Sequence, residues 1–225
     1  MYPNLICLFG PDGVGKSTQT EILYYTLFKK NGKDKTVWIR GPHTFSFILS
    51  KVLLRSGRFR LYRNPYGRVK KAIRIEGKTL KNLWAFIEFI SVLPIILVKV
   101  TTPLKLGFTI IADRYVLDSI VSIAYNVEDT TFIFGRLARI LLRQIPRRSI
   151  LIHLDCKYET LCHRRGRLVE PYQYIRFQKE CYRLLSDQIT SHYIDTSNKT
   201  IEQTSTCIID IIMKTIRHGM IHEKA

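Results

Sequence analysis

The stretch of sequence that decides the fold is Gly10-Pro11-Asp12-Gly13-Val14-Gly15-Lys16-Ser17. It fits the pattern G-x-x-x-x-G-K-[ST], in which a glycine-rich loop joins a strand to a helix. Glycines let successive backbone N–H groups point inward around phosphate oxygens, and the helix N-terminus adds the positive end of its dipole. We therefore expect a nucleotide to bind at Gly10, Pro11, Asp12, Gly13, Val14, Gly15, Lys16, Ser17 and Thr18.

Two side chains of this motif and one downstream carboxylate have expected roles in catalysis. The Lys16 ammonium should contact the β- and γ-phosphates, where charge develops during phosphoryl transfer. The Ser17 hydroxyl should bind Mg²⁺. Asp113 ends a later apolar run, as a metal-side carboxylate should. We therefore expect Mg²⁺ as cofactor, with Ser17 and Asp113 as its protein ligands.

The sequence around the motif alternates between strand and helix patterns. Residues 4–9 form an apolar run before the loop, residues 16–30 follow as a helix, and residues 36–39 resume as a strand. Similar strand patterns return at residues 108–112, 150–154 and 193–194. This alternation predicts an α/β fold of three layers, with a parallel sheet flanked by helices on both faces and ligands at the carboxyl ends of its strands.

Composition sets the class of protein and its partners. At 225 residues with 46% hydrophobic residues, the chain fits one domain with a mobile appendage. The net charge of +18 favours anionic partners without choosing among them. Five cysteines, an odd number and widely spaced, indicate a reducing compartment, so we expect a cytoplasmic protein.

Two segments depart from the α/β rhythm. The longest apolar run, residues 83–98, contains Glu88 and Pro94 and is shorter than the ~20 residues of a membrane span, so we expect a buried helix and no membrane partner. Residues 51–81 carry many Lys and Arg against the single acid Glu76, with loop signals at Asn64-Pro65 and Gly67. We expect this stretch to be an exposed basic excursion, either a solvated loop or a binding patch.

Downstream motifs distinguish among the nucleotide-binding classes. A GTPase would need N-K-x-D, but the nearest stretch, residues 198–201, ends in Ile201. In many motor and regulatory ATPases a glutamate that activates water follows the metal-side aspartate; here Arg114 follows Asp113. Arginine cannot act as a base, but it can bind a second phosphate. The pattern favours a kinase whose acceptor is already phosphorylated.

At this point the sequence resembles the thymidylate kinase family. The resemblance is carried by Gly10 to Gln19, by Asp113-Arg114-Tyr115 with Ser119, by the strand 151–155 followed by Arg164-Arg165-Gly166-Arg167, and by residues 193–197. These segments run in the family's order over nearly the whole chain. The resemblance implies transfer of phosphate from ATP to a nucleoside monophosphate, with thymidylate as the expected acceptor, and a homodimer joined through helices.

The resemblance also assigns roles to individual positions. It implies that Asp12 contacts the acceptor sugar or orients its phosphate, that Arg114 and Tyr115 bind the acceptor, and that Arg40 assists. Because Gly13 stands in the P-loop, the family's catalytic arginine would come from a lid at residues 163–171. The lid candidates are Arg164, Arg165 and Arg167.

Two departures from the family keep other acceptors open. Gly41-Pro42-His43 replaces an E-P-G-like turn, and the helix expected to read the base offers Trp84, Phe86 and Phe89 but no arginine. One alternative is a related kinase for another phosphorylated acceptor, with residues 51–81 as an altered lid or acceptor wall. Another is a nucleotide-gated nucleic-acid-binding module, because aromatics alternate with charges in that stretch. The kinase interpretation expects no nucleic-acid partner.

Overall fold

A computed structural model describes residues 3–28, 33–39, 46, 48, 49, 60–63, 69–72, 77–166 and 169–222. Its central sheet has five parallel strands in the order β2-β5-β1-β6-β7. The strands are β1 Leu5–Phe9, β2 Asp34–Val37, β5 Thr109–Asp113, β6 Ser149–Asp155 and β7 His192–Asp195. Every residue of β1 is buried, as expected for a central strand covered on both faces.

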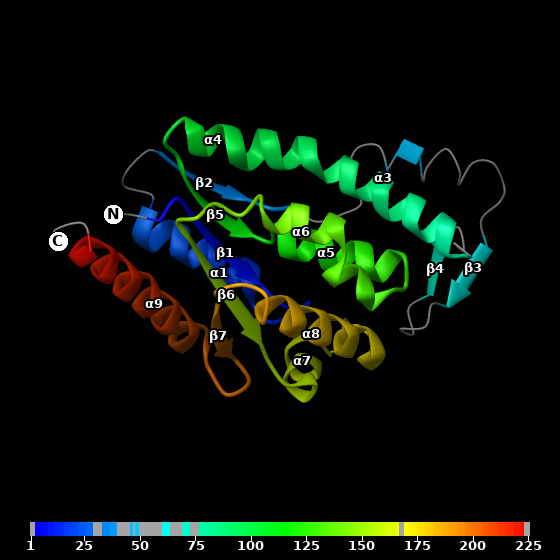
Figure 1. Cartoon of the computed structure of the whole chain (residues 1–225). Helices are drawn as coiled ribbons and strands as arrows, with labels where there is room; N and C mark the ends of the chain where they lie inside the picture. The colour runs from blue at the N-terminus through cyan, green and yellow to red at the C-terminus, as the bar shows by residue number, and fades with distance from the viewer. Residues whose placement is uncertain are drawn as a thin grey trace.

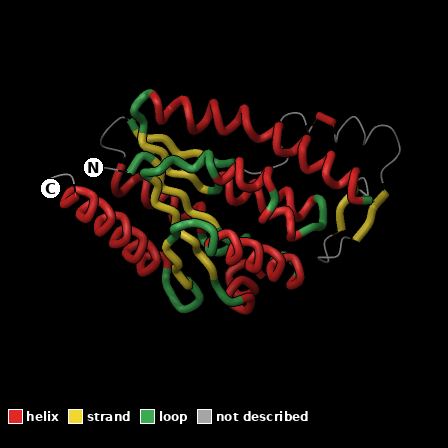
Figure 2. The backbone as a smooth tube through the Cα atoms, viewed as in Figure 1, coloured by secondary structure: helices red, strands yellow, loops and turns green. Residues whose placement is uncertain are grey.

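Helices cover both faces of this sheet (Figures 1 and 2). They are α1 Lys16–Leu23, α5 Val116–Asn126, α6 Arg136–Leu142, α7 Tyr158–Arg165, α8 Tyr172–Ser186 and α9 Ile201–His222, with single turns η1 Tyr24–Phe28 and η3 Thr130–Phe134. Helices α1 and α9 contact each other and the strands from one side. On the other side, α5 packs with α6 and α8. The predicted three-layer α/β fold is confirmed.

The strand register brings the predicted site residues to one edge of the sheet. Leu8 of β1 lies opposite Asp113 of β5, and Phe9 lies opposite His153 of β6. The loop after β1 therefore leaves the sheet between the carboxyl ends of β5 and β6. This is the edge at which parallel α/β sheets bind ligands.

The basic stretch contains regular structure that the sequence did not predict. Strands β3 Arg60–Arg63 and β4 Val69–Ala72 form a separate antiparallel pair. The stretch also ends earlier than expected, because α3 Lys78–Ile96 already begins at Lys78. The rest of residues 51–76 lies outside the described residues.

The apolar helix is longer than predicted and only half buried. α3 continues through the π-helical turn η2 Leu97–Thr101 into α4 Thr102–Lys105. One face packs on the domain through Phe89, Val92 and Ile96, whereas Leu83 and Leu97 are exposed. The prediction of a buried helix is therefore wrong for this second face. Among the described residues, 78–105 form the one helix long and apolar enough to cross a bilayer, judged by length and composition alone.

Candidate active site

The P-loop has the backbone conformation that its glycines were expected to allow. Gly10, Gly13 and Gly15 have φ values of 140°, 94° and 98°, in the range that other residues rarely adopt. A Cβ atom on Gly10 would lie 2.0 Å from the carbonyl oxygen of Leu154, so no larger residue fits there. The loop is thus pressed against the end of β6.

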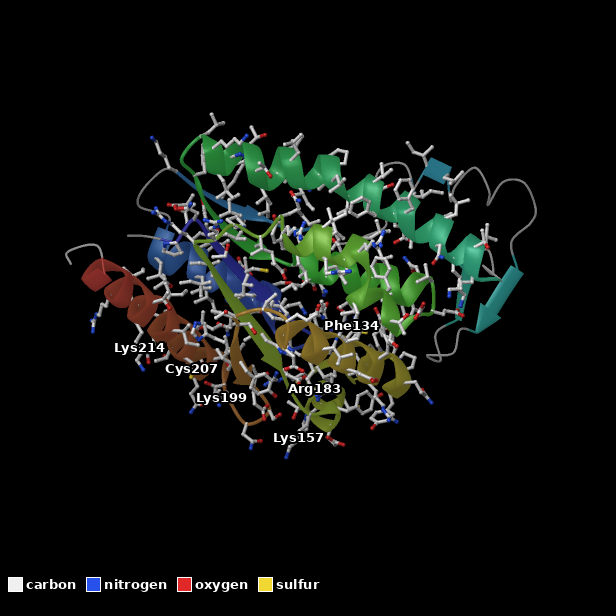
Figure 3. All side chains as sticks on the ribbon, viewed as in Figure 1. Phe134, Lys157, Arg183, Lys199, Cys207 and Lys214 are labelled. Atoms are coloured by element: carbon white, nitrogen blue, oxygen red, sulfur yellow. The ribbon has the colours of Figure 1, made fainter. Side chains whose placement is uncertain are left out.

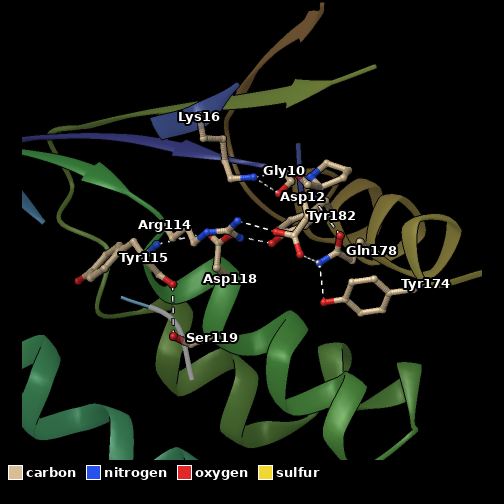
Figure 4. Close-up of polar contacts among 11 residues, drawn as sticks. Gly10, Asp12, Lys16, Arg114, Tyr115, Asp118, Ser119, Tyr174, Gln178 and Tyr182 are labelled. Carbon is tan, nitrogen blue, oxygen red and sulfur yellow. Dashed lines mark hydrogen bonds and ion pairs between the residues drawn. The ribbon is translucent and has the colours of Figure 1, made fainter. Parts of the chain in front are cut away.

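Lys16 is buried and folds back over its own loop. Its Nζ atom donates hydrogen bonds to the carbonyl oxygens of Gly10 and Pro11, both at 2.6 Å (Figure 4). Burial, followed by the nearby charge of Arg114, lowers the pKa of Lys16 to about 8. An anionic ligand at the loop would favour the charged form of Lys16.

Arg114 stands between two carboxylates at the end of β5. Its Nη2 atom lies 2.5 Å from Asp12 Oδ1, and its Nη1 atom lies 3.1 Å from Asp118 Oδ1 (Figure 4). Burial acts to lower the pKa of Arg114, but the charges of Asp118 and Asp12 outweigh it and hold the pKa above its usual range. Arg114 also has a φ of 78°, an uncommon backbone conformation for a residue with a side chain, and such outliers gather at functional sites.

Asp118 was missed by the sequence analysis. It lies four residues after Arg114, on the first turn of α5, and its Oδ2 atom accepts the backbone N–H of Tyr115 at 3.3 Å. Its Oδ1 atom accepts the hydroxyl of Tyr182 at 2.7 Å. The i, i+4 spacing of Arg114 and Asp118 at a helix start was the available signal.

Helix α8 supplies the other residues that the sequence did not single out. The side chain of Gln178 accepts the backbone N–H of Asp12 at 3.0 Å and donates to Asp12 Oδ2 at 3.3 Å. The hydroxyl of Tyr174 accepts a hydrogen bond from Gln178 at 3.0 Å. Tyr174, Gln178 and Tyr182 follow each other at four-residue intervals on the buried face of α8. That face therefore positions both carboxylates beside Arg114.

Tyr115 lies at the N-terminus of α5 but does not line the cavity that contains Arg114. Its buried side chain donates a hydrogen bond to the carbonyl oxygen of Gln144 at 2.9 Å. This contact ties the start of α5 to the turn after α6. A direct contact of Tyr115 with an acceptor stays a prediction.

The two described lid arginines have different surroundings. Arg164 donates to the backbone oxygen of Thr196 at 2.6 Å, to its hydroxyl at 3.1 Å and to the backbone oxygen of Lys199 at 3.3 Å. The side chain of Arg165 instead covers the P-loop, since a Cβ atom on Gly13 would lie 2.7 Å from Arg165 Cδ. The other two predicted arginines, Arg40 and Arg167, lie outside the described residues.

These groups share one cavity of about 770 Å³ at the carboxyl edge of the sheet. Its lining comprises Asp12 to Gln19, Arg114, Arg164, Arg165, Glu170, Thr196, Lys199 to Ile201 and Thr204. The structure thus brings the P-loop, Arg114 and two lid arginines together. Side chains fill the space between the sheet and its helices, and Lys157, Arg183 and Lys199 lie along the side formed by α7, α8 and the start of α9 (Figure 3).

The predicted metal ligands meet in a neighbouring cavity. Ser17 and Asp113 both line a hollow of about 370 Å³, and Ser17 also lines the main cavity. Asp113 Oδ1 is buried and has no hydrogen-bond partner among the described residues. An orphaned carboxylate oxygen beside a hydroxyl fits Mg²⁺, which uses one or two carboxylates together with substrate phosphates. Within the described part of the chain, no group of three acidic, His or Cys side chains offers a site made of protein alone.

The sheet order, the P-loop and the arginine after β5 define a P-loop kinase fold. Comparison with solved structures narrows this class to the fold of the thymidylate kinases. Thymidylate kinase from Candida albicans aligns with a TM-score of 0.58 and 23% identity, covering 96% of this chain and 94% of that one. Thymidylate kinase from Ehrlichia chaffeensis aligns with a TM-score of 0.53 and 13% identity, covering 95% of this chain and 100% of that one. No protein-family model and no curated protein sequence matches the chain.

Proposed function

We propose that this protein transfers the γ-phosphate of ATP to a nucleoside monophosphate, with thymidylate as the first expected acceptor. The observation that carries the proposal is the shared cavity of the P-loop and Arg114. A P-loop holds one phosphate chain, and a buried arginine aimed into the same cavity can bind a second phosphate. Both structural neighbours named above are thymidylate kinases.

The donor half would consist of the P-loop, Lys16 and the two metal ligands. For Lys16 to reach the phosphates, it would exchange the carbonyl oxygens of Gly10 and Pro11 for phosphate oxygens, which restore its full charge. Ser17 and Asp113 would hold Mg²⁺, which would supply positive charge to the phosphate chain. The backbone N–H groups of the loop then fix the position of the transferring group.

The acceptor half needs no strong base, because a monophosphate oxygen is already ionised at neutral pH. Its task is to bring two anions together and to neutralise the charge of the transferring group. Arg114, held by Asp12 and Asp118, would bind the acceptor phosphate from a fixed position. Arg165, stacked over Gly13, would supply the lid charge on the opposite side.

A second acceptor class is favoured by one observation on α3. In this helix a carboxylate is buried: Glu88 accepts hydrogen bonds from Trp84 at 2.6 Å and from Asn126 at 2.9 Å. No arginine lies between Lys78 and Lys105. A related kinase acting on another phosphorylated acceptor is therefore the second candidate. The Candida albicans neighbour is itself an enzyme of broad substrate specificity.

A coupled assay of ADP release tests the proposal and separates the two candidates. Purified protein with ATP and Mg²⁺ is offered thymidylate, the other nucleoside monophosphates and phosphorylated non-nucleotides at equal concentrations. We expect the highest kcat/KM with thymidylate, and activity lower by about 10³-fold or more in Lys16→Ala, the matched control. Turnover confined to another acceptor would select the second candidate. ATP hydrolysis that no acceptor stimulates would overturn both.

Three further expectations from the sequence stay proposals. We propose a cytoplasmic enzyme that forms a homodimer and has no nucleic-acid partner. Gel filtration with light scattering measures the oligomer directly. Titration of labelled single-stranded DNA with and without ATP tests the nucleic-acid alternative, since phosphate contacts would make affinity fall steeply with salt.

A further inference from the structure

A second large cavity lies apart from the P-loop. Its volume is about 890 Å³, compared with about 770 Å³ for the cavity that contains Arg114. Its walls come from β6 and β7, from the start of α7 and from one side of α8. Among the described residues, none lines both cavities. A hollow of this size is typical of sites for small ligands.

Helix α8 presents different sides to the two cavities. Tyr174, Gln178 and Tyr182 lie on the side that holds the carboxylates beside Arg114 (Figure 4). At about 100° per residue, the α8 residues that line the second cavity fall within an arc of roughly 140°, and that arc excludes these three. The residues in the arc include Tyr172, Arg176, Lys179, Arg183 and Ser186.

The wall that β6 contributes contains a buried polar side chain with an unused atom. His153 is 3% exposed and lines the cavity. Its Nδ1 atom lies 3.0 Å from the hydroxyl oxygen of Ser186, whereas its Nε2 atom has no hydrogen-bond partner among the described residues. Buried polar atoms are nearly always paired, so this one needs an explanation. A polar ligand in the cavity would supply the partner.

The surroundings of His153 combine an aromatic surface with a neutral polar group. Burial, followed by the charges of Lys16 and Lys179, lowers the pKa of His153 to about 4. The imidazole is therefore neutral at neutral pH, and each ring nitrogen is either a donor or an acceptor. The Phe9 ring stacks on it with centroids 5.0 Å apart, and the Tyr193 ring meets it edge-on at 5.4 Å. Tyr193 itself is 61% exposed, so its ring is open to a ligand.

Charge distinguishes this cavity from the kinase cavity. The kinase cavity has five basic side chains against two acidic ones, which suits a chain of phosphates. The second cavity has four basic and four acidic side chains. Two of its acids, Asp155 and Asp187, are paired with Lys179 at 3.3 Å and Arg183 at 4.0 Å. On a chain with a net charge of +18, this balanced lining favours an uncharged ligand over an anion.

We propose that the second cavity binds an uncharged ring compound with polar edges, of the size and chemistry of a nucleoside. The ring would pack on Tyr193, and a polar group would bond to His153. Hydroxyl groups both donate and accept hydrogen bonds, so they can bond to Asp155 and Lys179 together without adding charge. Because the two cavities have separate walls, both can be occupied at once. This binding is independent of which monophosphate the kinase accepts.

Equilibrium dialysis of the full chain against labelled thymidine and labelled adenosine tests the proposal. The kinase cavity is first filled with a non-hydrolysable ATP analogue and thymidylate. We expect saturable binding of at least one of the two nucleosides under these conditions. Tyr193→Ala should weaken this binding by about ten-fold, as expected for lost stacking on a base. His153→Phe should weaken it by about five-fold, since it keeps a ring beside Phe9 but removes the polar nitrogens.

The matched control is Phe134→Ala. Phe134 is an aromatic residue of η3 that is 53% exposed and does not line the second cavity (Figure 3). This variant should bind the nucleoside as the unchanged protein does. Equal weakening in Phe134→Ala and Tyr193→Ala, or no weakening in Tyr193→Ala, would overturn the proposal. Circular dichroism checks that all three variants are folded.

Two further outcomes would also overturn it. One is the absence of saturable binding for both nucleosides. The other is binding that disappears when the ATP analogue and thymidylate are present, because the nucleoside would then occupy the kinase cavity. If the protein is not a kinase for thymidylate, these two ligands have no effect on nucleoside binding, and Tyr193→Ala with its control still decides the outcome.

Discussion

The two sides of the P-loop are built differently. On the acceptor side, Arg114 is held by Asp12 and Asp118, and α8 holds these carboxylates in turn, all of them buried. On the donor side, Arg164 and Arg165 come from the end of α7 and lie at the surface, where Arg164 is tied to backbone oxygens of residues 196 and 199. One side is fixed before any ligand arrives, whereas the other is joined by contacts that a ligand can rearrange.

The two sides therefore have different tasks: the acceptor side positions the acceptor phosphate, and the donor side closes over the nucleotide. Fixed charges cost no reorganisation when the acceptor phosphate arrives, which is how preorganised sites stabilise a transition state. Arginines at the end of a short helix, of which Arg164 is exposed and Arg165 half-buried, can move with a bound nucleotide and exclude water on closing. We therefore expect substitutions on the acceptor side to change both stability and turnover, and those on the donor side to change turnover or ATP affinity alone.

The largest expected effect is at Lys16, which both sides share. Lys16→Ala removes the ammonium that neutralises charge on the transferring group, so kcat should fall by about 10³-fold or more. The fold should remain, because the substitution also removes a buried charge whose pKa is already lowered. Single-turnover kinetics and thermal unfolding check the two statements. Normal turnover in a folded variant would disprove the P-loop assignment.

The second-largest effect is expected from a substitution on the acceptor side. Arg114→Ala should raise the acceptor KM, lower kcat and leave ATP affinity nearly unchanged, because a charged contact to the acceptor phosphate is lost. It should also lower the free energy of unfolding by about 3 kcal/mol, since Asp12 and Asp118 lose their shared cation. The control is Asp118→Ala, in which Asp12 still holds Arg114. A weaker ATP affinity alone would place Arg114 in the donor site.

On the donor side, we expect the two arginines to affect different kinetic constants. Arg165→Ala should lower kcat by about 10²-fold with little loss of stability, as for one transition-state donor. Arg164→Ala should instead raise the KM for ATP by about ten-fold, because the segment at residues 196–199 loses its anchor. Arg217→Ala, an exposed arginine on α9, serves as the control and should change neither. If the two effects are exchanged, Arg164 is the catalytic arginine.

The smallest expected effect is a proton taken up when ATP binds. The pKa of Lys16 is lowered to about 8 in the free protein, and phosphate oxygens would raise it again. Below that pKa Lys16 is already charged and binding takes up no proton there; above it, up to one proton should enter with the nucleotide. Calorimetry in buffers of different ionisation enthalpy measures this. Proton uptake that persists in Lys16→Ala would show that a group other than Lys16 takes up the proton.

The sequence predicted those parts of the site that depend on local spacing. The P-loop, the arginine after β5 and the positions of the five parallel strands along the chain follow from short motifs and from apolar runs bounded by turns. Asp118 could also have been predicted, because it lies four residues, or about one helical turn, after Arg114. Gln178 and Tyr182 could not be predicted in the same way, because their partners are distant in sequence: Gln178 meets Asp12 of the P-loop, and Tyr182 meets Asp118 of α5, only when α8 has packed against both.

The exposed side of α3 shows a second limit of sequence reasoning. An apolar helix can be buried on all sides or on one, and periodicity cannot tell the two apart when nearly every residue is hydrophobic. Glu88 and Pro94 were used as signs of a core helix. In the structure Glu88 does face the core, with Asn126 of α5 as partner, but Pro94 faces outward. One half of the prediction therefore held and the other did not.

The hydrogen bonds of the P-loop region to the last two helices have a consequence for synthesis of the chain. Gln178 holds the backbone of Asp12, and the side chain of Gln19 is bonded to Ile201 and Ser205 at the start of α9. Strand β1 also has one of its two neighbours, β6, more than 130 residues downstream. During translation, β1 therefore emerges with an unpaired edge that stays open until β6 leaves the ribosome. Such distant pairings slow folding, and the nucleotide site cannot form before α8 and α9 have been made.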